Sequence, residues 1–333
     1  MRAPRRWRRR WTLAVGMGLI AVGVARLASR PRLSPPPPGA PRVAASPKVP
    51  VGLSVCWIES GRVGFATSSA LLIRHPSGNI LIDAGDSMTP RADFAHASLG
   101  ARAFIYSIPG FFKPTVPMSE LLERLGVSPG ALRAIVISHA HLDHLGGAMD
   151  VPAVPIWTPQ EEVDFAAKMR DRGTTHIAPR YADALASRGV PLHFVAKPYE
   201  LFSEQADLFG DGSVVVVRLP GHTPGSVGTF VNLSPDRRLF HVGDSVNELA
   251  QVHENLGKRR LMSITDVDGA GANATVGQIQ RVWREVPGVE IIPAHDRHAW
   301  ENVFGEQPRC IDSASRLDAR TLAPARQASG LGD

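Results

Sequence analysis

The sequence predicts an α+β protein folded as a four-layer αββα sandwich. Short apolar runs of strand length recur along the chain, and segments with helical spacing lie between them. The runs form two strand-rich halves that divide near Glu200, and each half has helices beside it. Histidine and aspartate residues follow the ends of several runs, which is typical of a layered scaffold with a shared site at its strand ends.

Strands are predicted where apolar and β-branched residues form runs bounded by turn residues. They cover residues 51–57, 70–74, 79–83, 134–138, 154–157, 192–195, 214–219, 227–232, 238–242 and 289–293. Helices are predicted over residues 118–125, 159–170 and 275–285. The first follows a proline and stops at a glycine, the second has acidic residues in its first turn, and the third has an apolar face.

The chain is expected to have four parts: residues 1–32 are a signal peptide or membrane anchor, 33–50 a Pro-rich linker, 51–306 the folded domain and 307–333 a disordered tail. Six arginines precede a mostly apolar stretch over residues 11–25, which is typical of an export signal and short for a membrane span of about 20 residues. The linker prolines favour an extended spacer that does not pack. We therefore expect an exported protein, periplasmic or membrane-anchored and facing outward.

Four candidate metal ligands, His139, His141, Asp143 and His144, fall within six residues directly after the apolar run 132–137. Burying such groups without partners is costly, and a metal ion removes that cost by binding them. Imidazole and carboxylate together suit zinc, with iron and manganese as alternatives. The cluster therefore predicts a metal centre that activates water.

Three further candidate ligands follow apolar runs later in the chain. His222 comes after residues 214–219, Asp244 after 239–242 and His295 after 289–292. The first cluster alone has too many ligands for one metal and too few for two, so these residues would complete it. The chain's other seven histidines lack such spacing and are expected to have ordinary core or surface roles.

The pattern His-x-His-x-Asp-His, followed by a later His, Asp and His, resembles the metallo-β-lactamase-fold hydrolase superfamily, nearest its acyl-homoserine lactonase-like branch. The segment 79–85 is also similar to the family's early strand, which ends in Asp-x-Gly. The resemblance implies the αββα sandwich and two divalent metal ions, Zn²⁺ first, with iron or manganese as alternatives. It also implies that Asp83 holds the metal loop in place without being a ligand.

The resemblance assigns a role to each candidate residue. One metal would be held by His139, His141 and His222, the other by Asp143, His144 and His295, with Asp244 bridging them. A hydroxide shared by the two metals would attack a substrate carbonyl. Asp143 would be the catalytic residue that orients this nucleophile and could pass its proton to the leaving group.

Hydrolysis of a lactone or ester is the expected reaction. True β-lactamases of this fold lack the bridging aspartate, whereas Asp244 is present here. The tyrosine that follows this aspartate in lactonases is replaced by Val246-Asn247, and Asn247 could donate a hydrogen bond to the substrate in its stead. A thioester hydrolase of glyoxalase II type and a non-haem iron oxidoreductase or sulfur dioxygenase are the alternatives.

The charge pattern favours a small-molecule substrate and no nucleic acid. The net charge is +6, but the first 32 residues hold nine arginines and no acid, so 6 − 9 leaves −3 for the rest. The N-terminal segment would associate with a membrane. The apolar loop 104–112 could make an ordinary core contact, wall a substrate cleft, touch a membrane or form a homodimer contact. The irregular stretch 247–273 is expected to be a pocket rim.

The chain has two cysteines, Cys56 and Cys310, at opposite ends of the domain, and they match no metal-binding spacing. They could pair after export or remain as two buried thiols, because the sequence does not give their distance in space.

Overall fold

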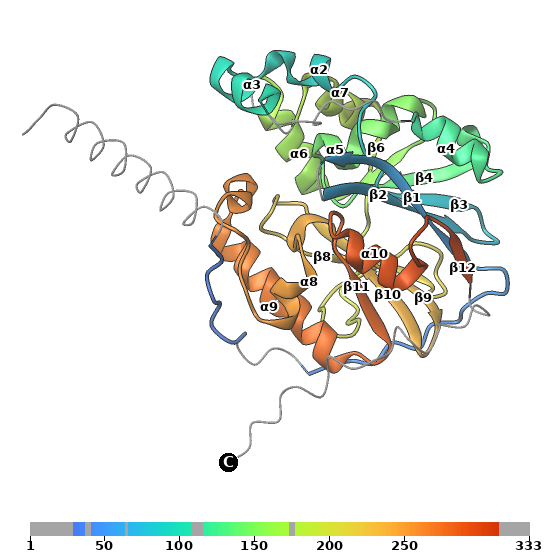
Figure 1. The fold of residues 1–333 in the computed structure, drawn as a ribbon. Helices are drawn as coiled ribbons and strands as arrows, with labels where there is room; N and C mark the ends of the chain where they lie inside the picture. Colours follow the sequence, from blue (N-terminus) through green and yellow to red (C-terminus); the bar gives the residue numbers. More distant parts are fainter. Residues whose placement is uncertain (1–28, 37–40, 64–65, 108–115, 173–176, 313–333) are drawn as a thin grey trace, which may run out of the picture.

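Two β-sheets form the centre of the computed structural model, which describes residues 29–36, 41–63, 66–107, 116–172 and 177–312 (Figure 1). The first sheet has the strand order β12-β1-β2-β3-β4-β5-β6 and the second β11-β10-β9-β8-β7. The first contains β1 (Ser54–Val63), β2 (Ala66–Arg74), β3 (Asn79–Ile82), β4 (Leu132–Val136), β5 (Ile156–Thr158), β6 (Gly189–Pro191) and β12 (Cys310–Asp312). The second contains β7 (Ala206–Asp207), β8 (Val214–Arg218), β9 (Val227–Ser234), β10 (Arg237–His241) and β11 (Val289–Ile292).

Helices cover the outer faces of both sheets. The longer ones are α3 (Leu99–Tyr106), α4 (Met118–Arg124), α6 (Gln160–Met169), α7 (Pro179–Arg188) and α9 (Gly269–Glu285). A further helix, α10 (Arg297–Phe304), instead packs Trp300 and Phe304 into the core between the two sheets. Short helical turns are α2 (Pro90–Asp93), α5 (Leu142–Leu145) and α8 (Leu249–His253), with 3-10 turns such as η4 (Gly243–Ser245) and η5 (Met262–Thr265). In Figure 1 the layers run from α6 and α7 through the two sheets to α8 and α9, which confirms the predicted αββα sandwich.

The core consists of three apolar clusters, one for each contact between layers. Leu81 and Ile135 of the first sheet pack with Tyr181 of α7. Trp57, which stacks on Trp300 with ring centroids 5.7 Å apart, belongs to the cluster between the two sheets. The third cluster joins the second sheet to α9. Each sheet is therefore buried on both faces, which explains why several strands read as continuous apolar runs.

The candidate ligands lie together because several strands point in the same direction. Strand β4 pairs in parallel with β3 and β5, and β10 pairs in parallel with β11. Strand β8 is antiparallel to β9, which is antiparallel to β10, so β8 and β10 also run the same way. The loops that follow these strands meet at one edge of the sandwich, and they carry the predicted histidine and aspartate ligands.

Several element boundaries differ from the prediction. The predicted strand 192–195 is wrong: the strand is β6, and Leu192 and Phe194 are apolar because they pack against the core between the sheets. Helix α9 begins at Gly269, six residues before the predicted start at 275, where the Asp268 side chain accepts hydrogen bonds from two amides. The stretch 247–273 is therefore not irregular throughout, since it contains α8, η5 and the first turn of α9.

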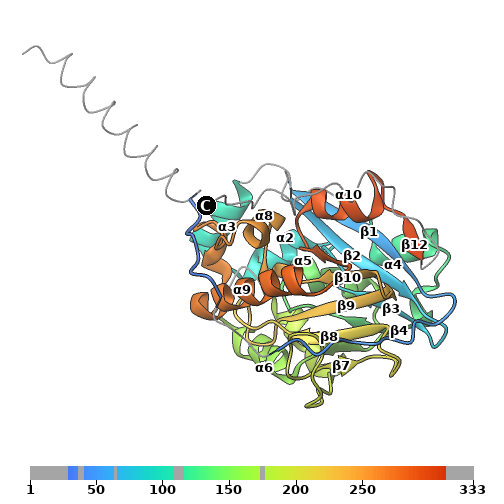
Figure 2. The same ribbon diagram turned by 90° about the horizontal axis from the view of Figure 1, so that it is seen from below.

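The linker packs on the domain, contrary to the prediction. Val43 pairs with Glu200 through hydrogen bonds of 2.8 Å in each direction, and the amide of Lys48 donates to the carbonyl of Asp211 at 2.7 Å. Ala45 and Val49 also contact core clusters. An extended Pro-rich segment makes few hydrogen bonds of its own, so its remaining backbone groups are free to pair with a neighbouring surface. Figure 2 shows this segment, in dark blue, crossing the second half of the domain.

The ordered domain extends to Asp312, beyond the predicted boundary at 306. Strand β12 pairs with β1, and Cys310, opposite Cys56 in this pair, forms a disulfide with it. Three predicted segments lie outside the described residues: the N-terminal signal or anchor up to position 28, residues 108–112 of the apolar loop, and the tail from 313 onward. Among the described residues, no helix combines the length and the apolar character needed to cross a bilayer.

Candidate metal centre

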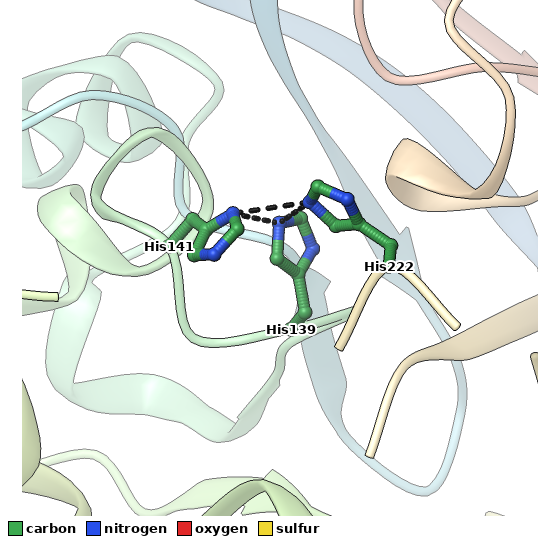
Figure 3. Close-up of side chains that lie close together, drawn as sticks. All are labelled: His139, His141 and His222. Atoms are coloured by element: carbon green, nitrogen blue, oxygen red, sulfur yellow. Dashed lines mark hydrogen bonds between the residues drawn. The ribbon is translucent and has the colours of Figure 1, made fainter. Parts of the chain in front are cut away.

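Three histidine side chains point toward one another where the two halves meet (Figure 3). Nε2 of His139 lies 3.0 Å from Nδ1 of His141. Nε2 of His222 lies 3.2 Å from the first of these atoms and 3.1 Å from the second. His139 and His141 come from the loop after β4, and His222 comes from the turn after β8. We name these three residues the first cluster.

A second cluster, formed by Asp143, His144 and His295, lies beside the first. Nε2 of His295 is 3.4 Å from Oδ2 of Asp143. Asp244 lies between the clusters: its Oδ1 is 3.0 Å from Nε2 of His295 and 3.3 Å from Nε2 of His144, and its Oδ2 is 3.6 Å from Nε2 of His222. Each cluster therefore faces a different oxygen of the same carboxylate.

The donor atoms have the spacing and chemistry of metal ligands. Nitrogens about 2.0–2.1 Å from a tetrahedral zinc ion would lie about 3.3 Å apart, close to the 3.0–3.2 Å in the first cluster. In the described part of the chain, Nε2 of His144 and Oδ1 of Asp244 are buried, and the contacts that these atoms make with each other and with His295 lack the geometry of a hydrogen bond. Unpaired polar atoms of this kind are costly, and a cation in the second cluster would bind both. The residues therefore fit a divalent metal ion in each cluster.

The other ring nitrogen of four candidate ligands makes a hydrogen bond that orients the ring. The pairs are His139 with Oγ of Ser138 at 3.1 Å, His144 with Oδ2 of Asp83 at 2.8 Å, His222 with Oδ1 of Asp266 at 2.8 Å, and His295 with the carbonyl of Thr67 at 2.7 Å. These contacts favour the tautomer that leaves the facing nitrogen available for a metal.

Asp83 holds the metal loop in place, as predicted. Its carboxylate accepts hydrogen bonds from the Ser138 amide at 2.6 Å and the Ser138 hydroxyl at 2.8 Å, in addition to that from His144. The loop that carries Asp244 packs closely against Ser138. Gly243 in this loop has a φ of +51°, and a Cβ atom there would lie 2.7 Å from Oγ of Ser138. Only glycine suits this position, because the conformation and the space both exclude a side chain.

Glu162 of α6 ties together the two loops of the first cluster. Its Oε1 accepts a hydrogen bond from the amide of Ala140 at 2.7 Å. Its Oε2 accepts from the Thr223 hydroxyl at 2.7 Å and from the Gly225 amide at 3.1 Å. Burial raises the pKa of this carboxyl to about 7, although these hydrogen bonds oppose the shift. The first cluster thus has a buried acid beside it that joins the backbones of its two loops.

A buried lysine extends the support of His222. The ammonium group of Lys258 lies 2.5 Å from Oδ1 of Asp266, the same oxygen that accepts from His222. Both side chains of this ion pair are only 3% exposed. The lysine neutralises a carboxylate that would otherwise be buried with a single neutral donor, so it stabilises the contact between Asp266 and the imidazole.

The two clusters differ in the charge that they favour. Burial, reinforced by the neighbouring imidazoles, holds the pKa of His139 well below its usual value, so this ring is neutral, as a metal ligand must be. Burial alone would also lower the pKa of His295, but the Asp244 carboxylate raises it to about 9. The carboxylates around the second cluster thus stabilise positive charge, which a divalent cation would supply.

Six of the seven candidate ligands form the two clusters and Asp244 lies between them, but several supporting residues were missed. Glu162 was noted only as an acidic residue at a helix start, and Asp266 carried no signal in the sequence. Lys258 belongs to a basic run that would ordinarily be solvated, yet it is buried. The backbone N–H of Asn247 donates to Oε1 of Gln251 at 2.7 Å, and the predicted hydrogen bond from Asn247 to a substrate stays a prediction.

Comparison with known families and sequences agrees with this geometry. The family model of the metallo-beta-lactamase superfamily matches residues 63–300. The N-acyl homoserine lactonase AttM of Azorhizobium caulinodans is 25% identical over 247 residues, which cover 72% of this chain and 86% of the relative. AttM of Agrobacterium fabrum is 24% identical and covers 69% and 82%, respectively. The hydroxyacylglutathione hydrolase GloC of Haemophilus influenzae is 28% identical over 130 residues, 38% of this chain and 55% of its own length.

Solved structures show the same fold. An N-acyl homoserine lactone hydrolase with the product N-hexanoyl-L-homoserine at its catalytic metal center has a TM-score of 0.51 at 18% identity and covers 73% of this chain and 92% of its own. An AiiA mutant from B. thuringiensis, with N-decanoyl-L-homoserine in its active site, has the same TM-score, identity and coverage.

Proposed function

The chain belongs to the metallo-beta-lactamase superfamily, and we propose that it is a hydrolase that uses two divalent metal ions, zinc first, to cleave the ester bond of a lactone. The position of Asp244 carries this proposal, because its two oxygens face the first and second clusters separately. A single metal at the first cluster would leave Asp143 and His295 without a metal to bind. Two metals would engage the whole set.

The residues provide a route for the proton during hydrolysis. When bound, a pair of metal ions supplies a hydroxide at neutral pH and polarises the substrate carbonyl. Asp143 is the most exposed member of the set, with 33% of its side chain accessible against 13% for His295 and 11% for Asp244. It would accept the proton of the attacking water. When the bond between the carbonyl carbon and the ring oxygen breaks, Asp143 would deliver that proton to the departing alkoxide.

The relatives favour a lactone over a thioester. Both AttM lactonases match over more than four fifths of their length, whereas the thioester-type relative GloC matches over 55%. Lactone hydrolysis does not require the missing tyrosine, because Asn247 follows Asp244 closely and could donate a hydrogen bond to the substrate carbonyl. An iron oxidoreductase remains the alternative from another enzyme class, and the metal content distinguishes it.

The test is metal analysis combined with a substrate panel. The full chain and its His139→Ala variant would be assayed against a lactone, an ester, a thioester and a β-lactam, with bound metal measured in each preparation. We expect lactone turnover that requires two equivalents of zinc and disappears in the variant. Turnover of the thioester alone would replace the lactone by the glyoxalase II type of substrate, and two bound irons without hydrolysis would contradict the proposal.

We also propose that the protein is exported, to the periplasm or to an outward-facing membrane position. The disulfide between Cys56 and Cys310 supports this, because structural disulfides persist mainly in oxidising compartments. Blocking free thiols in intact cells before denaturation would test it. Export predicts that neither cysteine is labelled without a reductant, and labelling of both in the native cell would contradict it.

A further inference from the structure

Four exposed apolar side chains gather beside the metal centre. Leu261, Met262, Ile264 and Val267 are 46%, 40%, 71% and 52% exposed, and they fall in and around η5. We name these four residues the apolar tip. Single exposed apolar residues are ordinary on a protein surface, but a group of large ones in one short segment indicates a surface that has a partner.

The apolar tip lies directly next to the first cluster. The amide of Val267 donates to the carbonyl of His222 at 3.0 Å, and Asp266, which precedes it, accepts from the ring of the same histidine at 2.8 Å. The tip is thus fixed to the metal centre at one end, while the side chain of Ile264 is the most exposed of the four.

Positive charge borders the apolar tip. Arg259 and Arg260 come immediately before it and are exposed, and Arg32, also exposed, pairs through its backbone with Leu256. The nearby carboxylate of Glu248 is neutralised by Arg30 and Arg259. The two carboxylates nearest the tip already have partners: Asp268 caps the start of α9, and Asp266 is paired with Lys258. An apolar surface edged by arginines is complementary to an anionic lipid headgroup layer over acyl chains.

The path of the chain leads from the basic and apolar N-terminal segment to the same place. Residues 1–28 contain seven arginines and the apolar stretch 11–25. The chain that continues from this segment runs against the base of the tip, where the amide of Arg260 donates to the carbonyl of Ser29 at 3.2 Å and that of Gly257 donates to Pro31 at 2.8 Å. Any attachment of the N-terminal segment to a membrane would therefore hold the apolar tip close to that membrane.

We propose that the apolar tip rests on the surface of a phospholipid bilayer, with its apolar side chains among the upper acyl chains and Arg260 at the headgroup phosphates. The metal centre then lies next to the lipid surface, so that an amphiphilic substrate reaches it from the bilayer. The proposal concerns a docking surface and does not depend on which bond the enzyme cleaves.

Site-specific fluorescence tests this proposal in the full chain. The protein's two cysteines are joined in a disulfide, so an added cysteine is the one free thiol for an environment-sensitive dye. One variant carries Ile264→Cys. The matched control carries Val51→Cys, at a residue 95% exposed in the turn before β1. In both views the blue chain that leads into β1 lies on the right, whereas α9, whose start follows η5 in the chain, lies on the left (Figures 1 and 2).

Each labelled protein would be mixed with phosphatidylcholine vesicles containing phosphatidylglycerol and a lipid with a nitroxide quencher high on its acyl chain. We expect several-fold stronger quenching of the dye at position 264 than at 51, and weaker quenching at 264 when Arg260→Glu is added. Equal quenching at both positions, or none at either, would overturn the proposal. So would a blue shift at 264 that grows with protein concentration in the absence of vesicles, because a second copy of the chain would then cover the tip.

Discussion

Replacing Asp83 by asparagine would show how strongly the metal centre depends on residues that do not bind metal. Asp83 has a φ of +56°, which aspartate and asparagine both tolerate, so the backbone need not change. The carboxylate accepts hydrogen bonds from the Ser138 amide, the Ser138 hydroxyl and the ring of His144. An asparagine turns one accepting oxygen into an NH₂ group, which must then face the N–H of either Ser138 or His144.

The magnitude follows from these contacts. A buried donor left without an acceptor costs about 1–3 kcal/mol of folding free energy. His144 also loses the partner that favours the tautomer with Nε2 directed at the second cluster. Loss of such a partner typically weakens metal binding about 10–100-fold, or about 1.4–2.8 kcal/mol. We therefore expect Asp83→Asn to lower both the stability of the metal-free protein and its affinity for zinc.

Competition with a chromophoric chelator measures the zinc affinity, and urea unfolding of the metal-free protein measures its stability. Asp93→Asn is the matched control, because Asp93 is also buried and accepts from Arg180 and Tyr181, which bind no candidate ligand. The control should lose stability and keep its zinc affinity. An unchanged zinc affinity in Asp83→Asn, or an equal loss in both variants, would refute the reasoning.

Three further predictions concern stability. Glu162→Gln should lower the free energy of unfolding in urea by about 1–3 kcal/mol, because the new side-chain N–H would face a backbone donor. Glu161→Gln, at the exposed neighbouring position, is the control and should change this free energy little. Equal losses in the two variants would argue that Glu162 does not hold the two loops together. Replacing Cys56 and Cys310 by serine opens a link between residues 254 positions apart and should cost about 2–4 kcal/mol; a melting temperature insensitive to reductant would contradict this. Burial alone would raise the pKa of Glu200, but hydrogen bonds from two arginines and a backbone amide lower it. The contribution of Glu200 to the free energy of folding is therefore complete above its unfolded pKa of about 4.3 and is lost as the pH falls through its folded pKa. The melting temperatures of the native protein and Glu200→Gln should converge in acid, and a difference that stays constant with pH would contradict this prediction.

The ligands could be predicted because local sequence places them. Four of them follow one apolar run within six residues, and each of the others follows a strand of its own. The strands were recognisable for the same reason, since β4 and β8 are apolar runs of the right length between turns. The disulfide could not be decided beforehand, because β12 is only three residues long and its pairing with β1 depends on contacts distant in sequence.

The supporting residues could not be predicted, because their roles arise from spatial neighbours. Glu162 touches one loop 22 residues and another 61 residues away in sequence, and nothing near it in the chain marks it as buried. Lys258 stands in a basic run that would ordinarily face solvent, and its burial depends on Asp266 lying beneath it. Composition alone predicts an unpacked linker, because it does not reveal that the backbone of Val43 pairs with that of Glu200.

The proposed dinuclear centre depends most directly on Asp244 joining two metal ions. X-ray absorption by the zinc-loaded full chain would measure the distance between them. We predict zinc–zinc scattering at about 3.5–4 Å, as in other two-metal hydrolases, together with two zinc ions per chain. A spectrum with nitrogen and oxygen neighbours only, at a single zinc ion per chain under saturating metal, would contradict the dinuclear centre.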